Sequence, residues 1–100
     1  MYDKAIEHLN RAIVLNPRYA VAYNNRGFTY TMLDKLDLAL EDFNKAIGFD
    51  QSDSMVGVYL DRGNLYLRRG DNGLAISDFL KACKLGNNEG CGALRAAQSR

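Results

Sequence analysis

The stretch YNNRGFTYTMLDKLDLALEDFNKAI, residues 23–47, is repeated 36 positions later as YLDRGNLYLRRGDNGLAISDFLKAC, residues 59–83. Tyrosine, arginine, glycine and tyrosine recur in the first half of each copy, and alanine, aspartate, phenylalanine, lysine and alanine recur in the second half. A shorter copy of the second half opens the chain at residues 5–13, 34 positions before its match. Self-similarity at such a period predicts a repeat protein in which each repeat is one supersecondary unit.

The second half of each copy has the periodicity of an amphipathic helix. Its apolar residues fall at positions i, i+1, i+4, i+7 and i+8, which in the middle copy are Ala39, Leu40, Phe43, Ala46 and Ile47. Turn-forming residues separate the helical segments near positions 16–17, 34–35, 50–54, 70–71 and 86–88. The sequence therefore predicts six helices and no strand, with the helices at 2–15, 19–33, 36–48, 54–69, 72–85 and 89–98.

Small residues recur where the two helices of a repeat would cross. Gly27 and Ala39 belong to one repeat, and Gly63 and Ala75 hold the same places in the next. Helices approach closely only where the side chains at the crossing are small, so we expect each pair to mark a contact. We also expect an ion pair within each repeat to fix the angle of its hairpin, namely Arg26–Asp42 and Arg62–Asp78.

The spacing Tyr-x3-Gly-x2-Tyr-x8-Ala-x3-Phe-x2-Ala resembles the tetratricopeptide repeat (TPR). The first full copy is carried by Tyr23, Gly27, Tyr30, Ala39, Phe43 and Ala46, and the second by Tyr59, Gly63, Tyr66, Ala75, Phe79 and Ala82. A half-copy opens the chain on Tyr2, Ala5, Leu9, Ala12 and Pro17. The resemblance covers residues 1–88 and implies an all-α fold, a TPR-type right-handed solenoid of antiparallel helix hairpins. The chain departs from the pattern where Gln51 and Asn87 replace the closing proline, and where two extra residues lie within 50–56.

This resemblance predicts a single TPR domain over residues 1–100. Residues 1–17 form the second helix of a partial repeat, 18–53 and 54–88 form two repeats, and 89–100 form a capping helix with Asn88 as its N-cap. Because the partial repeat lacks its first helix, we expect an uncovered apolar flank on Ala5, Leu9 and Ala12. The chain is then either a piece of a longer array, which we favour, or a module that covers this flank by homodimerisation.

The resemblance also implies function, because TPR domains bind a peptide or a partner-protein segment in a concave groove lined by the first helix of each pair. On the helix 19–33 the predicted groove residues are Val21, Asn24, Asn25, Phe28, Thr31 and Met32. On the helix 54–69 they are Gly57, Leu60, Asp61, Asn64, Leu67 and Arg68. Asparagine side chains both donate and accept, so they can pair with the backbone of an extended peptide without reading its sequence. The alternative is that these polar residues only solvate an exposed face.

The asparagines do not follow one known TPR arrangement. Some TPR domains hold a terminal carboxylate with a lysine followed four residues later by asparagine, but here Leu60 precedes Asn64 and Phe28 follows Asn24. The sequence therefore does not support a carboxylate clamp. Asn25 is similar to the asparagine that forms a ladder in some TPR domains, although Asp61 is its counterpart in the next repeat.

Two cysteines stand at the end of one predicted helix and the start of the next. Cys83 and Cys91 resemble the Cys-x7-Cys pair with which cysteine-rich relatives of TPR staple consecutive helices. A disulfide would fit an extracytoplasmic protein, and two reduced thiols in a core would fit a cytoplasmic one. The sequence leaves both alternatives open.

Composition and motif searches exclude several other classes. The net charge of +1 gives no broad basic surface for nucleic acid, and no apolar run is long enough for membrane insertion. One histidine and two cysteines cannot supply a four-ligand zinc site, so we predict no metal and no cofactor. Neither a Ser/His/Asp set nor a phosphate-binding glycine loop is present, and we predict that the chain is not an enzyme.

Overall fold

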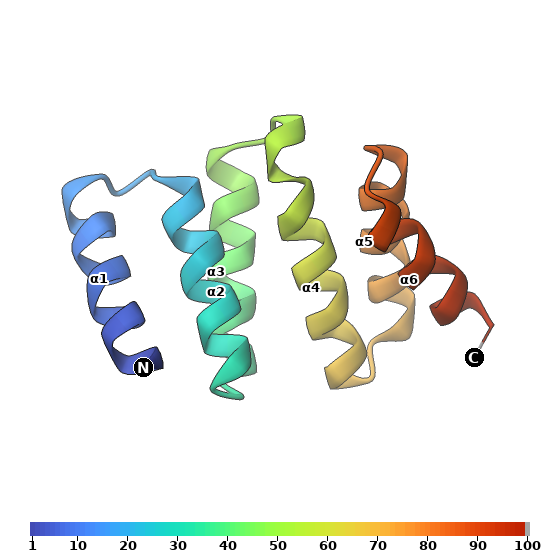
Figure 1. Cartoon of the computed structure of the whole chain (residues 1–100), viewed down its shortest axis with the longest axis horizontal. Coiled ribbons are helices and arrows are strands. Elements are labelled where there is room, and N and C mark those ends of the chain that lie inside the picture. The colour runs from blue at the N-terminus through green and yellow to red at the C-terminus, as the bar shows by residue number, and fades with distance from the viewer. Residues whose placement is uncertain (100) are drawn as a thin grey trace. The chain divides into compact units, whose positions relative to one another are not determined.

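The computed structural model describes residues 1–99, and within them every regular element is helical. The chain folds as two compact units that divide after Gln51. The first unit contains α1 (Tyr2–Leu15), α2 (Ala20–Met32) and α3 (Leu36–Phe49). The second contains a short 3-10 helix, η1 (Asp53–Met55), followed by α4 (Val56–Arg69), α5 (Asn72–Lys84) and α6 (Asn88–Gln98). The predicted all-α architecture of helix hairpins is confirmed (Figure 1).

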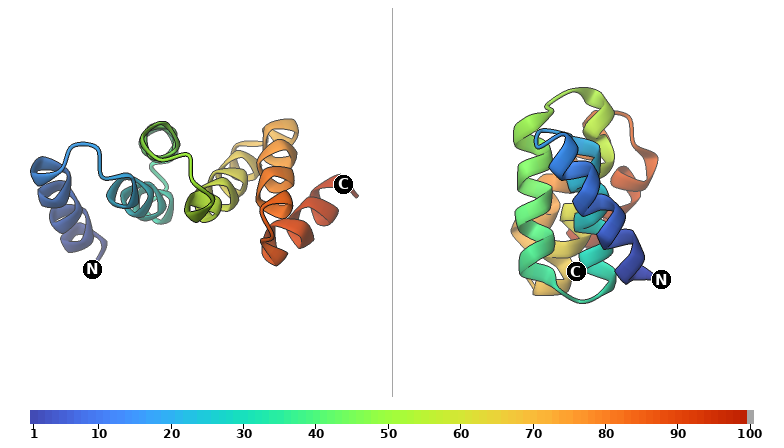
Figure 2. Two further views of the ribbon diagram at one scale, coloured as in Figure 1. Left: turned by 90° about the horizontal axis from the view of Figure 1, so that it is seen from above. Right: turned by 90° about the vertical axis from the view of Figure 1, so that its left-hand side faces the viewer.

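In the first unit, α2 and α3 form an antiparallel hairpin around the predicted glycine contact. The two helices lie side by side in both Figure 1 and Figure 2. A Cβ at Gly27 would lie 2.8 Å from the Cδ1 and Cε1 atoms of Phe43, whose ring is fully buried. Such a distance is too short for any side chain, so the glycine lets the ring lie directly on the backbone of α2. α1 also packs against α2.

The second unit repeats this construction and adds α6. A Cβ at Gly63 of α4 would lie 2.6 Å from Cε1 of Phe79 on α5. α6 packs on α5 through a third close approach, where a Cβ at Gly90 would lie 2.7 Å from the Cβ of Ala82. A cluster of apolar side chains joins the three helices: Ala75, Phe79 and Ala97 are buried, and Leu60, Tyr66, Leu67, Ile76, Ala93 and Leu94 pack against them.

Both predicted ion pairs are confirmed, and each has two parallel hydrogen bonds. The Nε and Nη2 atoms of Arg26 donate to Oδ2 and Oδ1 of Asp42 at 2.8 Å each, and Arg62 donates to Asp78 with the same two distances. Two tyrosine rings lie near each guanidinium. The ring centroids of Tyr23 and Tyr30 are 5.5 and 5.9 Å from Cζ of Arg26, and those of Tyr59 and Tyr66 are 5.8 and 5.7 Å from Cζ of Arg62. Because both aspartates are buried, the fork geometry fixes the two helices of each hairpin to one another.

Two local predictions were wrong. The helix expected over 54–69 begins only at Val56, because the extra residues form a 3-10 turn in which the N–H of Met55 donates to the carbonyl of Ser52 at 3.0 Å. The N-cap of α6 is Asn87 rather than Asn88. Its Oδ1 accepts from the backbone N–H of Gly90 at 2.7 Å, three residues on, which is the geometry that a capping side chain requires.

Candidate functional site

The exposed face of α2 carries three apolar side chains and one amide. Val21, Phe28 and Met32 are 40%, 47% and 44% exposed, and Asn25 is also exposed. Their spacing of i, i+4, i+7 and i+11 places them along one side of the helix. We call these four residues the α2 stripe. The position of Gly27 against Phe43 on α3 holds the opposite side of α2, so the stripe is left free by the packing of its own hairpin.

The other two residues predicted on this helix are less available. Thr31 is buried, and its hydroxyl donates to the carbonyl of Gly27 at 2.9 Å. Asn24 is half-buried, and its Oδ1 is a buried acceptor that finds no hydrogen-bond partner among residues 1–99. A buried acceptor without a hydrogen bond lowers the stability of the fold by about 1–3 kcal/mol. The side-chain oxygen of Asn24 is therefore unfavourable for stability and is too buried to contact a ligand. Because Thr31 is buried, its side chain is not available as a ligand contact.

The matching face of α4 is polar. Asp61, Asn64 and Arg68 occupy the positions that correspond to Asn25, Phe28 and Met32, and we call them the α4 stripe. Asn64 and Arg68 are exposed, whereas Asp61 is half-buried.

Asp61 lies where its carboxylate is poorly solvated. Burial first, and the neighbouring carboxylate of Glu89 second, raise the pKa of Asp61 from 3.8 to about 6. Sequence reasoning did not identify Glu89 as a neighbour of Asp61. The only signal was the place of Glu89 in the first turn of the last helix, whose position depends on tertiary packing.

Leu60 belongs to the interior of its unit. It is half-buried and packs against the cluster of Ala75, Phe79 and Ala97. The sequence placed Leu60 in the predicted groove set because it matches Asn24 of the preceding repeat, and the structure leaves its side chain only partly accessible. The reason is that α6 covers the side of the unit on which Leu60 lies, and no periodicity within α4 could show that.

Two of the four arginines on the two stripe helices form ion pairs within their own hairpins. Arg26 is the single charged residue of α2 and is bound to Asp42, while α4 has Arg62 bound to Asp78. Neither helix contains lysine. Within residues 1–99 there is no group of three His, Cys, Asp or Glu side chains that could hold a metal ion, and no helix with the length and apolar character to cross a bilayer.

The predicted flank of α1 is only partly open. Ala5, Leu9 and Ala12 are half-buried, whereas Val14 and Leu15 at the end of the helix are 78% and 86% exposed. An open hollow of about 460 Å³ lies beside them and is lined by Glu7, Asn10, Arg11, Val14 and Leu15. The more exposed apolar surface of α1 therefore lies nearer its C-terminus than the sequence predicted.

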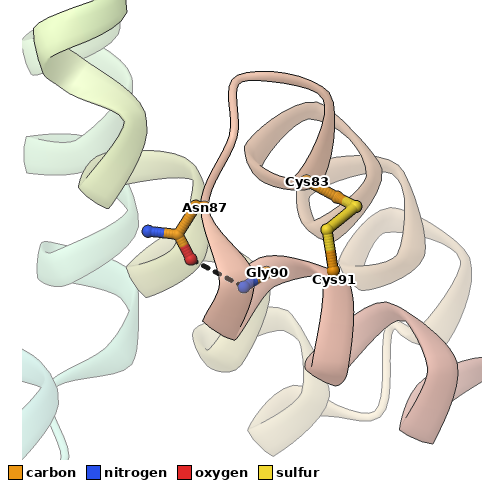
Figure 3. The surroundings of a disulfide bond; sticks show 4 residues. All are labelled: Cys83, Asn87, Gly90 and Cys91. Atoms are coloured by element: carbon orange, nitrogen blue, oxygen red, sulfur yellow. Dashed lines mark hydrogen bonds between the residues drawn. A yellow bond between two sulfur atoms is a disulfide. The ribbon is translucent and has the colours of Figure 1, made fainter.

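Cys83 and Cys91 form a disulfide in the structure, with their Cα atoms 4.5 Å apart (Figure 3). It joins the last turn of α5 to the first turns of α6, next to the hydrogen bond between Asn87 and Gly90. The fold therefore brings together the two cysteines that the sequence had singled out.

Comparison with known families agrees with this architecture. One family model described as TPR repeat matches residues 1–34, and two described as tetratricopeptide repeat match residues 20–53 and 56–88. The chain belongs to the tetratricopeptide repeat family.

Particular relatives are longer proteins. TPR repeat-containing thioredoxin TDX of Arabidopsis thaliana is 37% identical over 93 residues, which cover 93% of this chain and 24% of the relative. Tetratricopeptide repeat protein 36 of Danio rerio is 35% identical over 85 residues, covering 83% and 46%. The chain thus spans between a quarter and a half of the length of these relatives.

Solved TPR domains are similar over nearly the whole chain. The Arabidopsis OM64 TPR domain has a TM-score of 0.89 and 28% identity, covering 99% of this chain and 82% of that one. The first TPR of Spaghetti (RPAP3), bound to the HSP90 peptide SRMEEVD, has a TM-score of 0.89 and 26% identity, covering 98% and 78%. The second TPR domain of human RPAP3, in complex with the HSP70 peptide SGPTIEEVD, has a TM-score of 0.86 and 27% identity, covering 99% and 82%.

Proposed function

We propose that the chain is a non-catalytic protein-interaction module within a longer TPR protein, and that it binds a peptide or partner-protein segment on the exposed faces of its first helices. The observation that carries this proposal is the α2 stripe, where large apolar side chains stand exposed on a helix whose other side is fixed by packing. Two structurally similar TPR domains are bound to peptides, which supports the same use here.

The α2 stripe offers two kinds of contact. Val21, Phe28 and Met32 supply apolar area, and burying it contributes about 25 cal/mol per Å². Asn25 stands between them and can both donate to and accept from a peptide backbone. Apolar anchors with an amide at their centre favour a segment that carries apolar side chains on one side and keeps its backbone within reach of the amide.

The α4 stripe offers a separate set of polar contacts on the second unit. The exposed Asn64 offers the same donor and acceptor pair as Asn25, and Arg68 offers a cation near the end of α4. The half-buried Asp61 adds a carboxylate whose pKa is raised to about 6, and above that pH its negative charge disfavours an acidic segment next to it. A short surface of this kind predicts modest affinity unless further repeats in the longer protein contribute.

Selection of peptides from a randomised display library against the immobilised chain tests this proposal. We expect the selected peptides to bind the wild-type chain and to lose at least about 10-fold in affinity to the double variant Asn25→Ala/Phe28→Ala, because one anchor and one backbone contact are removed. The matched control is Leu74→Ala/Leu80→Ala, which removes exposed apolar side chains from the second helix of a repeat. Equal losses in both variants, or no loss in either, would contradict the proposal.

Self-association is the second candidate function, and the exposed end of α1 favours it. Val14 and Leu15 stand beside an open hollow, and a second copy could bury them. Size-exclusion chromatography with light scattering tests this candidate directly. A dimer that dissociates in the variant Val14→Ser/Leu15→Ser supports it, and a monomer at all concentrations removes it.

We further propose that the Cys83–Cys91 element is a staple of the kind found in cysteine-rich relatives of TPR. The support is that it joins the second helix of one repeat to the next helix along the chain, as a Cys-x7-Cys staple requires. Mass measurement without reductant tests it, since a bridged pair is lighter than two thiols by two hydrogen atoms.

A further inference from the structure

α6 is the shortest α-helix among residues 1–99. It has 11 residues, and two of them, Gly90 and Gly92, lie inside the helix. Helices this short are marginal by themselves in water, and each interior glycine costs about 1 kcal/mol relative to alanine. α6 must therefore be held by its contacts with the rest of the second unit.

Those contacts are small. α6 packs mainly on α5, and its apolar side chains in the cluster are Ala93, Leu94 and Ala97. Two of the three are alanines, so the apolar area that α6 buries is limited. The cluster has larger members on the other helices, among them Phe79 and Leu67. The loss of α6 would therefore expose apolar surface on α4 and α5 as well as on α6 itself.

The other interactions that hold α6 on α5 all lie near the N-terminus of α6. The disulfide between Cys83 and Cys91, the cap from Asn87 to Gly90, and the close approach of Gly90 to Ala82 lie within a few residues of one another (Figure 3). Of these, the disulfide is the covalent one. By closing a short loop it removes open arrangements of α6 that would otherwise compete with the docked one.

We propose that the Cys83–Cys91 disulfide is a redox latch that keeps α6 docked on α5, and that reduction by a dithiol frees the helix. In the reaction a thiolate of the dithiol attacks one sulfur and displaces the other as a thiolate. The second thiolate of the dithiol then resolves the mixed disulfide. The protein gains two electrons and two protons to form two thiols, and the dithiol becomes a disulfide. Both cysteines are partly exposed, so a small dithiol can reach them.

Freeing α6 changes the surface of the second unit in two ways. It withdraws Ala93, Leu94 and Ala97 from the cluster and so exposes part of Leu60, Leu67 and Phe79. It also takes the carboxylate of Glu89 away from Asp61, a member of the α4 stripe. The redox state of the disulfide thereby determines how much apolar surface the second unit exposes and whether the carboxylate of Glu89 stays near the α4 stripe. This inference does not depend on peptide binding and can fail while the proposed function stands.

Hydrogen exchange of the full chain before and after treatment with dithiothreitol tests the latch. A mass gain of two hydrogen atoms shows that the bridge is reduced. We expect the amides of residues 92–98 to exchange about 10- to 100-fold faster after reduction, while those of α2 and α3 change less than about twofold. This comparison uses the wild-type chain throughout and needs no variant to fold.

The double variant Cys83→Ala/Cys91→Ala serves as the matched control. Without reductant its α6 amides should exchange as fast as those of the reduced wild-type chain, and dithiothreitol should have no further effect. The proposal is overturned if reduction leaves exchange in residues 92–98 within twofold of the bridged chain. It is also overturned if the chain purified in air carries two free thiols.

Discussion

The contact between Gly63 and Phe79 gives a sharp test of how the hairpins are built. The perturbation is Gly63→Ala, which adds one methyl group where an ideal Cβ would lie 2.6 Å from Cε1 and 2.8 Å from Cδ1 of Phe79. Because the Phe79 ring is fully buried, it has no free space into which to turn. Overpacking of this kind costs about 1–3 kcal/mol.

Helix propensity opposes this loss of stability, because alanine is a better helix former than glycine. A glycine of the same helix with free space around it measures the propensity effect alone and serves as the control. Alanine favours a helix over glycine by about 1 kcal/mol, so we expect the net loss of Gly63→Ala to be at most about 2 kcal/mol. Gly57→Ala lies on the same helix with nothing within 4 Å of its added Cβ, so there the propensity acts alone. We expect that variant to gain about 0.5–1 kcal/mol.

Urea unfolding followed by far-ultraviolet circular dichroism measures both variants against the wild-type chain. The unfolding midpoint of Gly57→Ala should lie above that of Gly63→Ala, with a difference in free energy of about 0.5–3 kcal/mol between the two variants. If Gly63→Ala stabilises the chain as much as Gly57→Ala does, α4 and α5 do not pack as closely as the structure shows and the reasoning is refuted.

Three more outcomes are expected. Asp61→Asn should stabilise the chain by about 1 kcal/mol at pH 7 after allowance for partial solvent exposure, because burial and Glu89 raise the pKa of Asp61 from 3.8 to about 6. The folded state binds the Asp61 proton more tightly than the unfolded state does, so the stabilisation by Asp61→Asn should grow as pH rises from about 4 to about 6 and vanish below about pH 4. Urea titrations at several pH values measure it, and a stabilisation that does not change with pH would show that the raised pKa is not its cause. Arg62→Lys should lower the free energy of unfolding by about 1–2 kcal/mol, because it removes the paired hydrogen bonds to the buried Asp78. Arg11→Lys, in the exposed pair with Glu7, should change the free energy of urea unfolding by less than about 0.5 kcal/mol. Equal effects of the two substitutions would argue against the two-hydrogen-bond geometry of Arg62. The peptide SRMEEVD should bind more weakly than a Kd of about 100 μM in fluorescence anisotropy, because the stripe helices lack lysine and the carboxylate of Asp61 would repel its acidic end. Tighter binding would show that an arginine of α4, such as Arg68, outweighs this repulsion.

The hairpins could be predicted from the sequence because their contacts repeat. Gly27 and Gly63 stand at the same place in two copies, and so do the phenylalanines that lie on them. The partners of Arg26 and Arg62 recur at the same offset, which identified the ion pairs before any coordinates. A contact that repeats can be recognised from one sequence, because the same residue types recur at the same spacing in both copies.

The features that could not be predicted depend on contacts made once. Leu60 is predicted to line the groove, and it is half-buried because it also packs against the cluster of α5 and α6. The approach of Glu89 to Asp61 depends on where α6 docks, and no second copy of α6 exists within the chain to reveal a pattern. The position of Thr31 was missed for another reason, since its hydroxyl is satisfied within its own helix by the carbonyl of Gly27.

The central claim is that the exposed face of the first helix of a repeat receives the partner. The most direct test is a titration of the methyl-labelled chain with a peptide selected against it, followed by NMR. We predict that the methyl signals of Val21 and Met32 shift with the peptide while those of Leu74 and Leu80 stay in place. Shifts confined to Leu74 and Leu80, with Val21 and Met32 unmoved, would contradict the account.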